Sequence, residues 1–297
     1  MKTLQKISIL LFSFLTLAVL SCQHFAEALN TAGVIDQNTA NAIGQSSQAI
    51  GKAAETITPE QEYYIGRAVA ANILSTYKIW EGSPRLTAYL NRICNAIVIN
   101  SPRPEIYNGY HVMLLNSNEI NAFATSGGHI FITRGLAGIA KSEDALAGVI
   151  AHEIAHIQLQ HSIKSIKTSR ITQALMITGV SAASAASGYN VNELTDVFNE
   201  SVGEIVSTMV NNGYSQNQEY EADSTALSLL AATGYNPSGL LDMLKELSKV
   251  QTGSSSGFGK THPTPEKRIA NVNRHLGKYK VADTSSFRQA RFNDSTR

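Results

Sequence analysis

The sequence of 297 residues predicts a mainly α-helical domain with a small β-sheet, an α+β fold. Capping boxes that begin at Thr58 and Ser215 each mark a helix start. Two short β-rich runs, residues 110–115 and 128–133, supply the sheet. A third helix start at Ser142 is followed by apolar residues at helical spacing, namely Leu146, Val149, Ile150, Ile154 and Ile157.

The first 21 residues have the layout of a bacterial lipoprotein signal. Two lysines precede an uncharged apolar run, residues 7–20, and Cys22 stands where the lipidated residue is expected. Gln23 after this cysteine favours the outer membrane, by analogy with enteric bacteria. Because Leu20 is not the usual small residue near the cleavage site, an uncleaved anchor or plain secretion is the alternative.

The rest of the chain divides into three parts. Residues 22–57 are rich in Ala, Asn, Gln and Ser and are expected to form a tether. The main domain is expected to span residues 58–276, about 220 residues, which is ample for one core. Within it, the uncharged run 171–188 favours a packed helix, which can touch a lipid surface, over a membrane span. Residues 277–297 are polar and are predicted to form a loose C-terminal tail.

Charge and cysteine content exclude two classes of protein. Without the two lysines of the signal, 22 of the 24 basic residues remain against 23 acidic ones, so the net charge is −1. This balance offers no basic footprint for nucleic acid. With Cys22 acylated, Cys94 is the only remaining thiol, which excludes an intramolecular disulfide. Its position on an apolar helical face predicts a buried, inert thiol.

The helix that begins after Ser142 carries the HExxH pattern, residues 152–156. Residues four apart lie on one helical face, so His152 and His156 can hold one zinc ion with Glu153 beside it as a general base. The alternative is an amphipathic helix whose histidines are partly buried or solvated.

A second set of acids opens the helix that begins after Ser215. Glu219 and Asp223 are four residues apart and share a face. Glu219 can therefore ligate the metal while Asp223 accepts the free N–H of a ligating imidazole. Alone, these acids would more often form a solvated helix face.

Four motifs occur along the chain: Asn121-Ala122-Phe123-Ala124 leading into Gly127-Gly128-x-Ile130, His152-Glu153-x-x-His156, Glu219-x-x-Ala222-Asp223, and His262-Pro263 with Arg268-Ile269. In this order they resemble the gluzincin family of membrane-linked peptidases that includes BepA, LoiP, HtpX and the CAAX prenyl protease. The resemblance covers residues 58–276 and implies a zincin-type domain with one Zn²⁺ per chain.

The resemblance also implies the role of each matching residue. The zinc ligands are His152, His156 and Glu219, and Glu153 is the general base. Asp223 is a supporting residue that contacts a ligand and not the metal. The substrate-binding positions that it implies are Asn121, Ala122, Gly128 and Ile130.

The run 129–133 has a physical interpretation of its own. As an edge strand it would pair with an extended substrate through backbone hydrogen bonds, which position a peptide without selecting many of its side chains. An ordinary hairpin strand packed on the helices is the alternative.

His262 lies between a Gly/Ser-rich loop, residues 252–260, and a helix start at Pro265. It would either stabilise the oxyanion of the tetrahedral intermediate or occupy the fourth zinc position and block the water. A capping or surface histidine is the third interpretation. By the resemblance, Arg268 orients this segment or a substrate carbonyl.

Two functions are consistent with these residues. The first is a zinc endopeptidase of the bacterial periplasm that is lipid-anchored and cleaves exposed or misfolded envelope proteins by attack of a zinc-activated water. The second is a chaperone-like assembly factor whose peptidase site is mostly closed by His262. The expected partners are extended envelope proteins, the membrane through the lipid anchor, and an envelope assembly complex.

Overall fold

A computed structural model gives the fold. Described are residues 57–164, 199–200, 202–207, 209, 213–250, 261–262, 265–280, 283 and 285–296. The predicted signal, Cys22, the tether up to residue 56, the run 171–188 and the loop 252–260 lie outside these residues.

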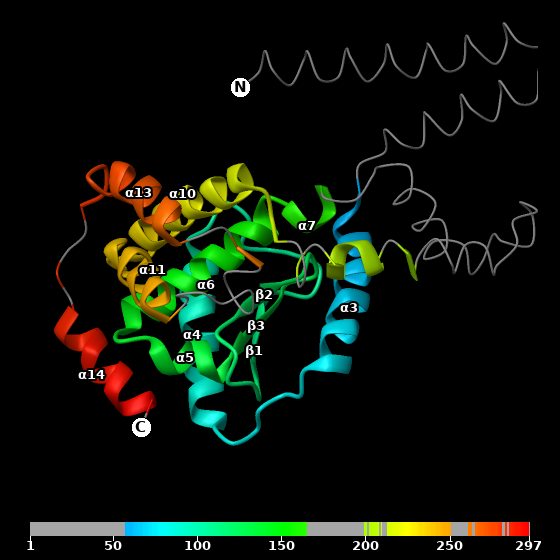
Figure 1. Ribbon diagram of the computed structural model, residues 1–297, viewed down its shortest axis with the longest axis horizontal. Coiled ribbons are helices and arrows are strands. Elements are labelled where there is room, and N and C mark those ends of the chain that lie inside the picture. Colours follow the sequence, from blue (N-terminus) through cyan, green and yellow to red (C-terminus); the bar gives the residue numbers. More distant parts are fainter. Residues whose placement is uncertain are drawn as a thin grey trace, which may run out of the picture. The chain divides into compact units, whose positions relative to one another are not determined.

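The described residues confirm the predicted class, because helices surround a single small sheet (Figure 1). No described helix combines the length and the apolar composition that crossing a membrane requires. The elements in chain order are α3 (Pro59–Thr76), α4 (Pro84–Ile99), β1 (His111–Leu115), β2 (Ala122–Ala124), β3 (His129–Thr133), α5 (Arg134–Ile139), α6 (Glu143–Gln158), α7 (His161–Lys164), α10 (Gln216–Thr233), α11 (Ser238–Val250), α13 (Pro265–Leu276) and α14 (Ser285–Ser295).

The three helix starts predicted from capping residues are confirmed. Thr58 and Ser215 each form a complete capping box, at the start of α3 and α10 respectively. The Ser142 hydroxyl accepts a hydrogen bond from the amide of Ala145 at 3.1 Å, which caps α6. Gly234 ends α10 with a φ of +87°, a left-handed conformation that glycine adopts without steric cost.

The sheet has the order β1-β3-β2, with β1 parallel and β2 antiparallel to β3. Both predicted strands exist, but the prediction that residues 129–133 form an edge strand is wrong, because β3 is hydrogen-bonded on both sides. The outer strands are β1 and β2, and the three residues of β2 are too few to show a period of two in the sequence.

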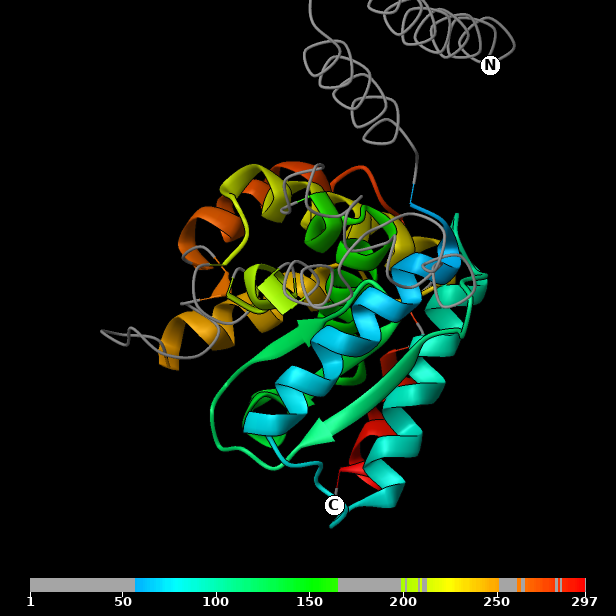
Figure 2. The ribbon, with the colours of Figure 1, turned by 90° about the vertical axis from the view of Figure 1, so that its right-hand side faces the viewer.

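The two faces of the sheet are covered by different helices. Alternate strand residues join the core beneath α4 and α6, namely Val112, Leu114, Ala122, Ala124, Ile130 and Ile132. Phe123 and Phe131 point to the other face, where α3 lies across the sheet (Figure 2). The ring of Tyr77, which caps the end of α3, lies 5.6 Å from the ring of Phe123. The sheet is therefore a buried middle layer.

Helix α6 runs through the centre of the domain and contacts α4, α10 and α11. Its backbone touches that of α11 at two glycines. A methyl group on Gly148 would lie 2.7 Å from Leu240 Cα, and one on Gly239 would lie 2.2 Å from the Asp144 carbonyl oxygen. Any side chain at either position would push the two helices apart. On α4, Cys94 is fully buried and burial raises the pKa of its thiol to about 12, which confirms the predicted inert cysteine.

The predicted loose C-terminal tail is wrong for residues 285–295, which form α14 and pack against α6. Two arginines explain the docking. Arg288 Nε lies 2.9 Å from an oxygen of Asp144, and Arg291 Nε donates to Glu143 at 3.0 Å. Both carboxylates lie in the buried first turn of α6. A sequence that looks polar is therefore ordered by ion pairs with acids far away in the chain.

Candidate metal centre

Two imidazoles converge on one face of α6. His152 and His156 are both 1% exposed, and their Nε2 atoms are 3.0 Å apart. The one-turn spacing of a helix places them there, since residues i and i+4 lie above one another. An acid from α10 lies in front of these two nitrogens.

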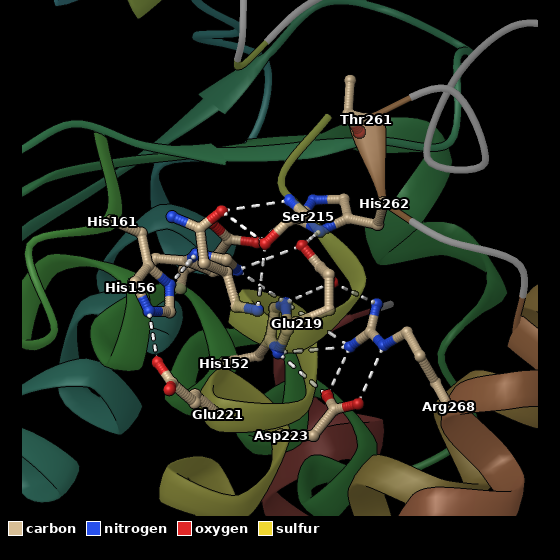
Figure 3. A network of polar contacts seen from close by, with 12 residues as sticks. His152, His156, His161, Ser215, Glu219, Glu221, Asp223, Thr261, His262 and Arg268 are labelled. Atoms are coloured by element: carbon tan, nitrogen blue, oxygen red, sulfur yellow. Dashed lines mark hydrogen bonds and ion pairs between the residues drawn. The ribbon is translucent and has the colours of Figure 1, made fainter. Parts of the chain in front are cut away.

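Glu219 is the acid, and it is fully buried in the first turn of α10. Its carboxylate oxygens lie 3.4 Å from His152 Nε2 and 3.5 Å from His156 Nε2 (Figure 3). Ligands about 2.05 Å from a tetrahedral zinc ion are about 3.3 Å apart. The two nitrogens are 3.0 Å apart, and each lies near a different oxygen of the Glu219 carboxylate, at distances close to those between ligands of one zinc ion.

The charges of the site also fit a divalent cation. Glu153, Glu219 and Asp223 are buried carboxylates, and the Arg268 guanidinium contacts the last two. Three negative charges and one positive charge leave an excess of two, which a divalent ion cancels. Within the described residues, one oxygen each of Glu153 and Glu219 accepts no hydrogen bond. Such atoms are costly to bury unless an ion or water contacts them.

Asp223 and Arg268 hold His152 from behind. Asp223 Oδ1 lies 3.0 Å from His152 Nδ1, so the carboxylate accepts the Nδ1 proton and leaves Nε2 for the metal. Arg268 Nη2 donates to the same oxygen at 2.6 Å. The arginine side chain is buried and contacts Glu219, Asp223 and His152, so it orients residues of the metal cluster. The prediction that it orients the His262 segment or a substrate carbonyl stays a prediction.

The two ligating imidazoles have opposite tendencies to bind a proton. Burial and the charge of Arg268 lower the pKa of His152, but hydrogen bonds to Asp223 and Glu219 outweigh them and raise it to about 9. Burial lowers the pKa of His156 to about 3. His156 thus presents a lone pair at every physiological pH, whereas a metal ion must displace a proton from His152.

A second chain of contacts, from His161 and Glu221, supports His156. His161 Nδ1 lies 2.9 Å from His156 Nδ1, and His161 Nε2 lies 3.3 Å from Glu221 Oε2. If His156 binds a metal through Nε2, its Nδ1 carries the proton, so His161 must accept at Nδ1 and donate from Nε2 to the carboxylate. From spacing alone, His161, five residues after His156, is expected to be a helix-end or supporting histidine and not a ligand, and Glu221 is expected to point away from the site. The position of Glu221 depends on where α10 meets α7.

Tyr214 is a residue of the site that the sequence did not indicate. Its ring stacks on that of His156 with a centroid distance of 4.3 Å and an interplanar angle of 21°. The stacking fixes the plane of the imidazole from a third side. Tyr214 directly precedes the capping residue Ser215, and that place in the sequence is the one signal that could have identified it.

Glu153 and His262 lie on the side of the ligands that the supporting residues leave uncovered. Glu153 is 2% exposed, and burial is the largest cause that raises its pKa, which suits a base that must both accept and return a proton. His262 Nε2 lies 4.0 Å from Glu153 Oε1, and His262 Nδ1 lies 2.8 Å from Glu219 Oε1. His262 therefore belongs to the same cluster as the three predicted ligands.

The segment that carries His262 is attached to the sheet. Thr261 Oγ1 donates to Asn121 Oδ1 at 3.0 Å, and the same oxygen accepts the amide of Ala122 at 2.9 Å. Asn121 is 1% exposed, so its side chain supports this segment. The prediction that Asn121 contacts substrate directly is not supported by this arrangement.

Two of the predicted substrate-binding residues are unable to pair with a peptide. Ile130 lies on β3 and has strand partners on both sides. Gly128 uses both backbone groups, since its amide donates to Thr125 and its carbonyl accepts from His111. The prediction of strand pairing at these positions is wrong for the same reason as the edge-strand assignment. Ala122, on β2, is the remaining candidate.

Comparison with known proteins agrees with this geometry. The sequence profile of peptidase family M48 matches residues 84–276, which include all the proposed metal ligands. The chain belongs to peptidase family M48. The resemblance stated from the four motifs is thereby confirmed, and the cluster of histidines and acids is identified as a divalent-metal site of the zincin type.

Several curated relatives have similar sequences. The metalloprotease LoiP of Escherichia coli is 28% identical over 192 residues, which cover 65% of this chain and 69% of LoiP. The β-barrel assembly-enhancing protease of Yersinia pestis is 27% identical over 211 residues, 68% of this chain but 41% of that protein. The mitochondrial metalloendopeptidase OMA1 of Schizosaccharomyces pombe is 26% identical over 206 residues, 67% of this chain and 56% of OMA1. The match thus covers less than half of the Yersinia protein.

His161→Phe is expected to lower zinc affinity by about 10- to 100-fold, because the ring remains but can no longer accept the His156 proton. Competition with a chromophoric chelator measures this dissociation constant. The matched control is His275→Phe on α13, where the imidazole contacts Lys278 and none of the ligands. Equal zinc affinity in the wild-type chain and His161→Phe would contradict a supporting role for His161.

Proposed function

We propose that this chain is a zinc-dependent endopeptidase of the bacterial cell envelope that cleaves exposed or misfolded proteins. The observation that carries the proposal is the convergence of His152, His156 and Glu219, with the buried Glu153 beside them. Membership of peptidase family M48 supports the hydrolysis of peptide bonds as the reaction.

The residues of the site divide the reaction between them. Zinc, when bound, lowers the pKa of a water molecule and polarises the scissile carbonyl. Glu153 takes the proton from the attacking water and returns it to the leaving amine. Asp223 and Arg268 hold His152 in one tautomer, and His161 does the same for His156.

The backbone of β2 supports binding of an extended peptide. Asn121, Phe123 and Thr125 turn their backbone groups toward β3, as the hydrogen bonds of Thr133 and His129 and the strand register show. In an antiparallel pair, the residues between them, Ala122 and Ala124, turn theirs away. A substrate strand pairing with these two residues would be held mainly by its backbone, which supports broad sequence specificity.

A second function has one observation in its favour. His262 lies in the ligand cluster, so as a fourth ligand it would exclude water and keep the site closed at rest. A chain in that state would act as a chaperone-like assembly factor on extended envelope proteins, and its peptidase activity would be mostly latent. The names of the relatives from Yersinia pestis and Escherichia coli, β-barrel assembly-enhancing protease, support an assembly complex as a partner.

For the location, the lipoprotein layout around Cys22 supports a lipid anchor that faces the periplasm, with Gln23 favouring the outer membrane. Residues 22–57 would form the tether between this anchor and the domain of residues 58–276. A net charge near zero provides little electrostatic attraction to a membrane, so the anchor carries the attachment.

Glu153→Gln is expected to retain one zinc per chain and to lose cleavage of β-casein, because the ligands remain while the base does not. Zinc content by atomic absorption and casein cleavage are measured on the same sample. Glu219→Gln is the contrasting variant and should lower zinc affinity, since a neutral amide replaces an anionic ligand. Wild-type turnover in Glu153→Gln would contradict the assignment of the base.

His262→Ala is expected to raise kcat on an unstructured peptide if His262 closes the fourth position at rest. The measurement is made at equal zinc occupancy in both proteins. A loss of about 100-fold would instead assign His262 to the oxyanion, since that is the usual effect of removing one donor. An unchanged kcat would contradict both roles.

Cys22→Ser is expected to release the chain from membranes during a detergent-free wash, because it removes the site of acylation. Immunoblots of washed membrane and soluble fractions measure the distribution. Cys94→Ser, which alters the buried thiol and not the anchor, is the matched control. Retention of Cys22→Ser on membranes would contradict the lipid anchor.

A further inference from the structure

One side-chain oxygen, Asn121 Oδ1, joins strand β2 to the segment that carries His262. Asn121 Oδ1 accepts the outward amide of Ala122 at 2.9 Å and the Thr261 hydroxyl at 3.0 Å. Both hydrogen bonds are buried, and the three residues are each at most 2% exposed. The edge of β2 at Ala122 is therefore covered by a side chain of its own chain.

Thr261 is next to His262, whose Nδ1 lies 2.8 Å from Glu219 Oε1 (Figure 3). A hydrogen bond that fixes Thr261 therefore restricts the position of His262 relative to the metal ligands. Asn121 is in turn fixed from the other side, because its amide donates to Thr133 Oγ1 and its carbonyl accepts from the Thr133 amide. The contact joins β3, β2 and the His262 segment at one residue.

An added substrate strand cannot coexist with this arrangement. It would lie about 4.8 Å from β2, and one of its carbonyls would have to accept the Ala122 amide in place of Asn121 Oδ1. Thr261, which hydrogen-bonds the same oxygen, stands in the path of that strand. Pairing at Ala122 must therefore displace the Asn121 carboxamide and the Thr261 contact together.

We propose that Asn121 couples occupancy of the β2 edge to the position of His262: a substrate strand that takes the Ala122 amide releases Thr261 and moves His262 away from the ligands. This inference rests on the proposed function, because it assumes that β2 receives substrate. It makes Asn121 and Thr261 positioning residues that act through His262, and it links opening of the metal site to arrival of a peptide.

The test measures the accessibility of His262 and needs no turnover. The full zinc-loaded chain with Glu153→Gln, which does not consume the probe, is treated with diethyl pyrocarbonate, and modification of His262 is followed by peptide mass spectrometry. Adding Thr261→Val or Asn121→Ala should raise this rate about fivefold, the equilibrium factor for loss of one neutral hydrogen bond. The His262 modification rate of the double variant should be close to that of each single variant, because both substitutions remove the same Thr261–Asn121 hydrogen bond.

Controls separate the hydroxyl from general damage. Thr261→Ser keeps a donor and should behave as the parent. Thr233→Val, at a hydroxyl that bonds the Leu229 carbonyl in the last turn of α10, should also leave the rate unchanged. Circular dichroism melts of every variant show whether the fold is retained, and Asn121→Ala provides the second route if Thr261→Val does not fold.

The peptide arm tests the coupling itself. A saturating synthetic decapeptide of Val, Ser and Lys, free of histidine, should raise the His262 rate in the parent and have little further effect in Thr261→Val. The proposal would be overturned if Thr261→Val and Asn121→Ala both showed the same His262 modification rate as the chain with Glu153→Gln alone. It would also be overturned by a peptide that binds without exposing His262, or by one that fails to bind at all. Failure of the proposed function would appear separately, as absence of zinc-dependent casein cleavage by the chain with Glu153 intact.

Discussion

Three carboxylates, those of Glu153, Glu219 and Asp223, are buried between α6, α10 and α13. The rest of the site compensates their negative charge. Asp223 is balanced by Arg268, which comes from a helix some 45 residues further along the chain. The remaining negative charge, on Glu153 and Glu219, matches a divalent ion. In such a medium an unbalanced charge costs several kcal/mol, so the metal is as much a structural counter-ion as a reagent.

This requirement also accounts for the layers of polar contacts around the ligands. Each imidazole is fixed by its own set of partners: Asp223 and Arg268 behind His152, His161 and Tyr214 around His156. The supports come from α7, α10, α13 and the residue before the cap of α10, so these segments must pack together before both rings are held in one orientation. Glu153 and His262 lie together beside the ligands, and we have proposed that the reaction takes place there.

Features that depend on local spacing could be predicted from the sequence. The two histidines of the HExxH pattern lie on one face because an α-helix repeats every 3.6 residues. Ser142, Thr58 and Ser215 each cap a helix by accepting a hydrogen bond from the amide three residues later. Both strands of the parallel pair were also evident from their apolar, β-branched composition.

Features that depend on distant partners could not be predicted in this way. The order β1-β3-β2 is a matter of pairing between separate strands, which the composition of β3 alone does not specify. The motif around Asn121 predicted a substrate-binding side chain. Its hydrogen bond to Thr261, 140 positions later in the sequence, is visible only in the folded structure. The C-terminal residues appeared loose because Arg288 and Arg291 find their acids only in the folded domain.

Docking of α14 connects the C-terminal residues to the helix that carries the proposed metal ligands. Glu143 and Asp144 stand in the buried first turn of α6, and arginines of α14 supply part of their counter-charge. Tyr89 and Tyr235 also donate hydrogen bonds to Glu143, so α14 completes a polar network that other elements begin. Because the same helix presents His152 about two turns further on, a change in the position of α14 is transmitted to the site through the start of α6.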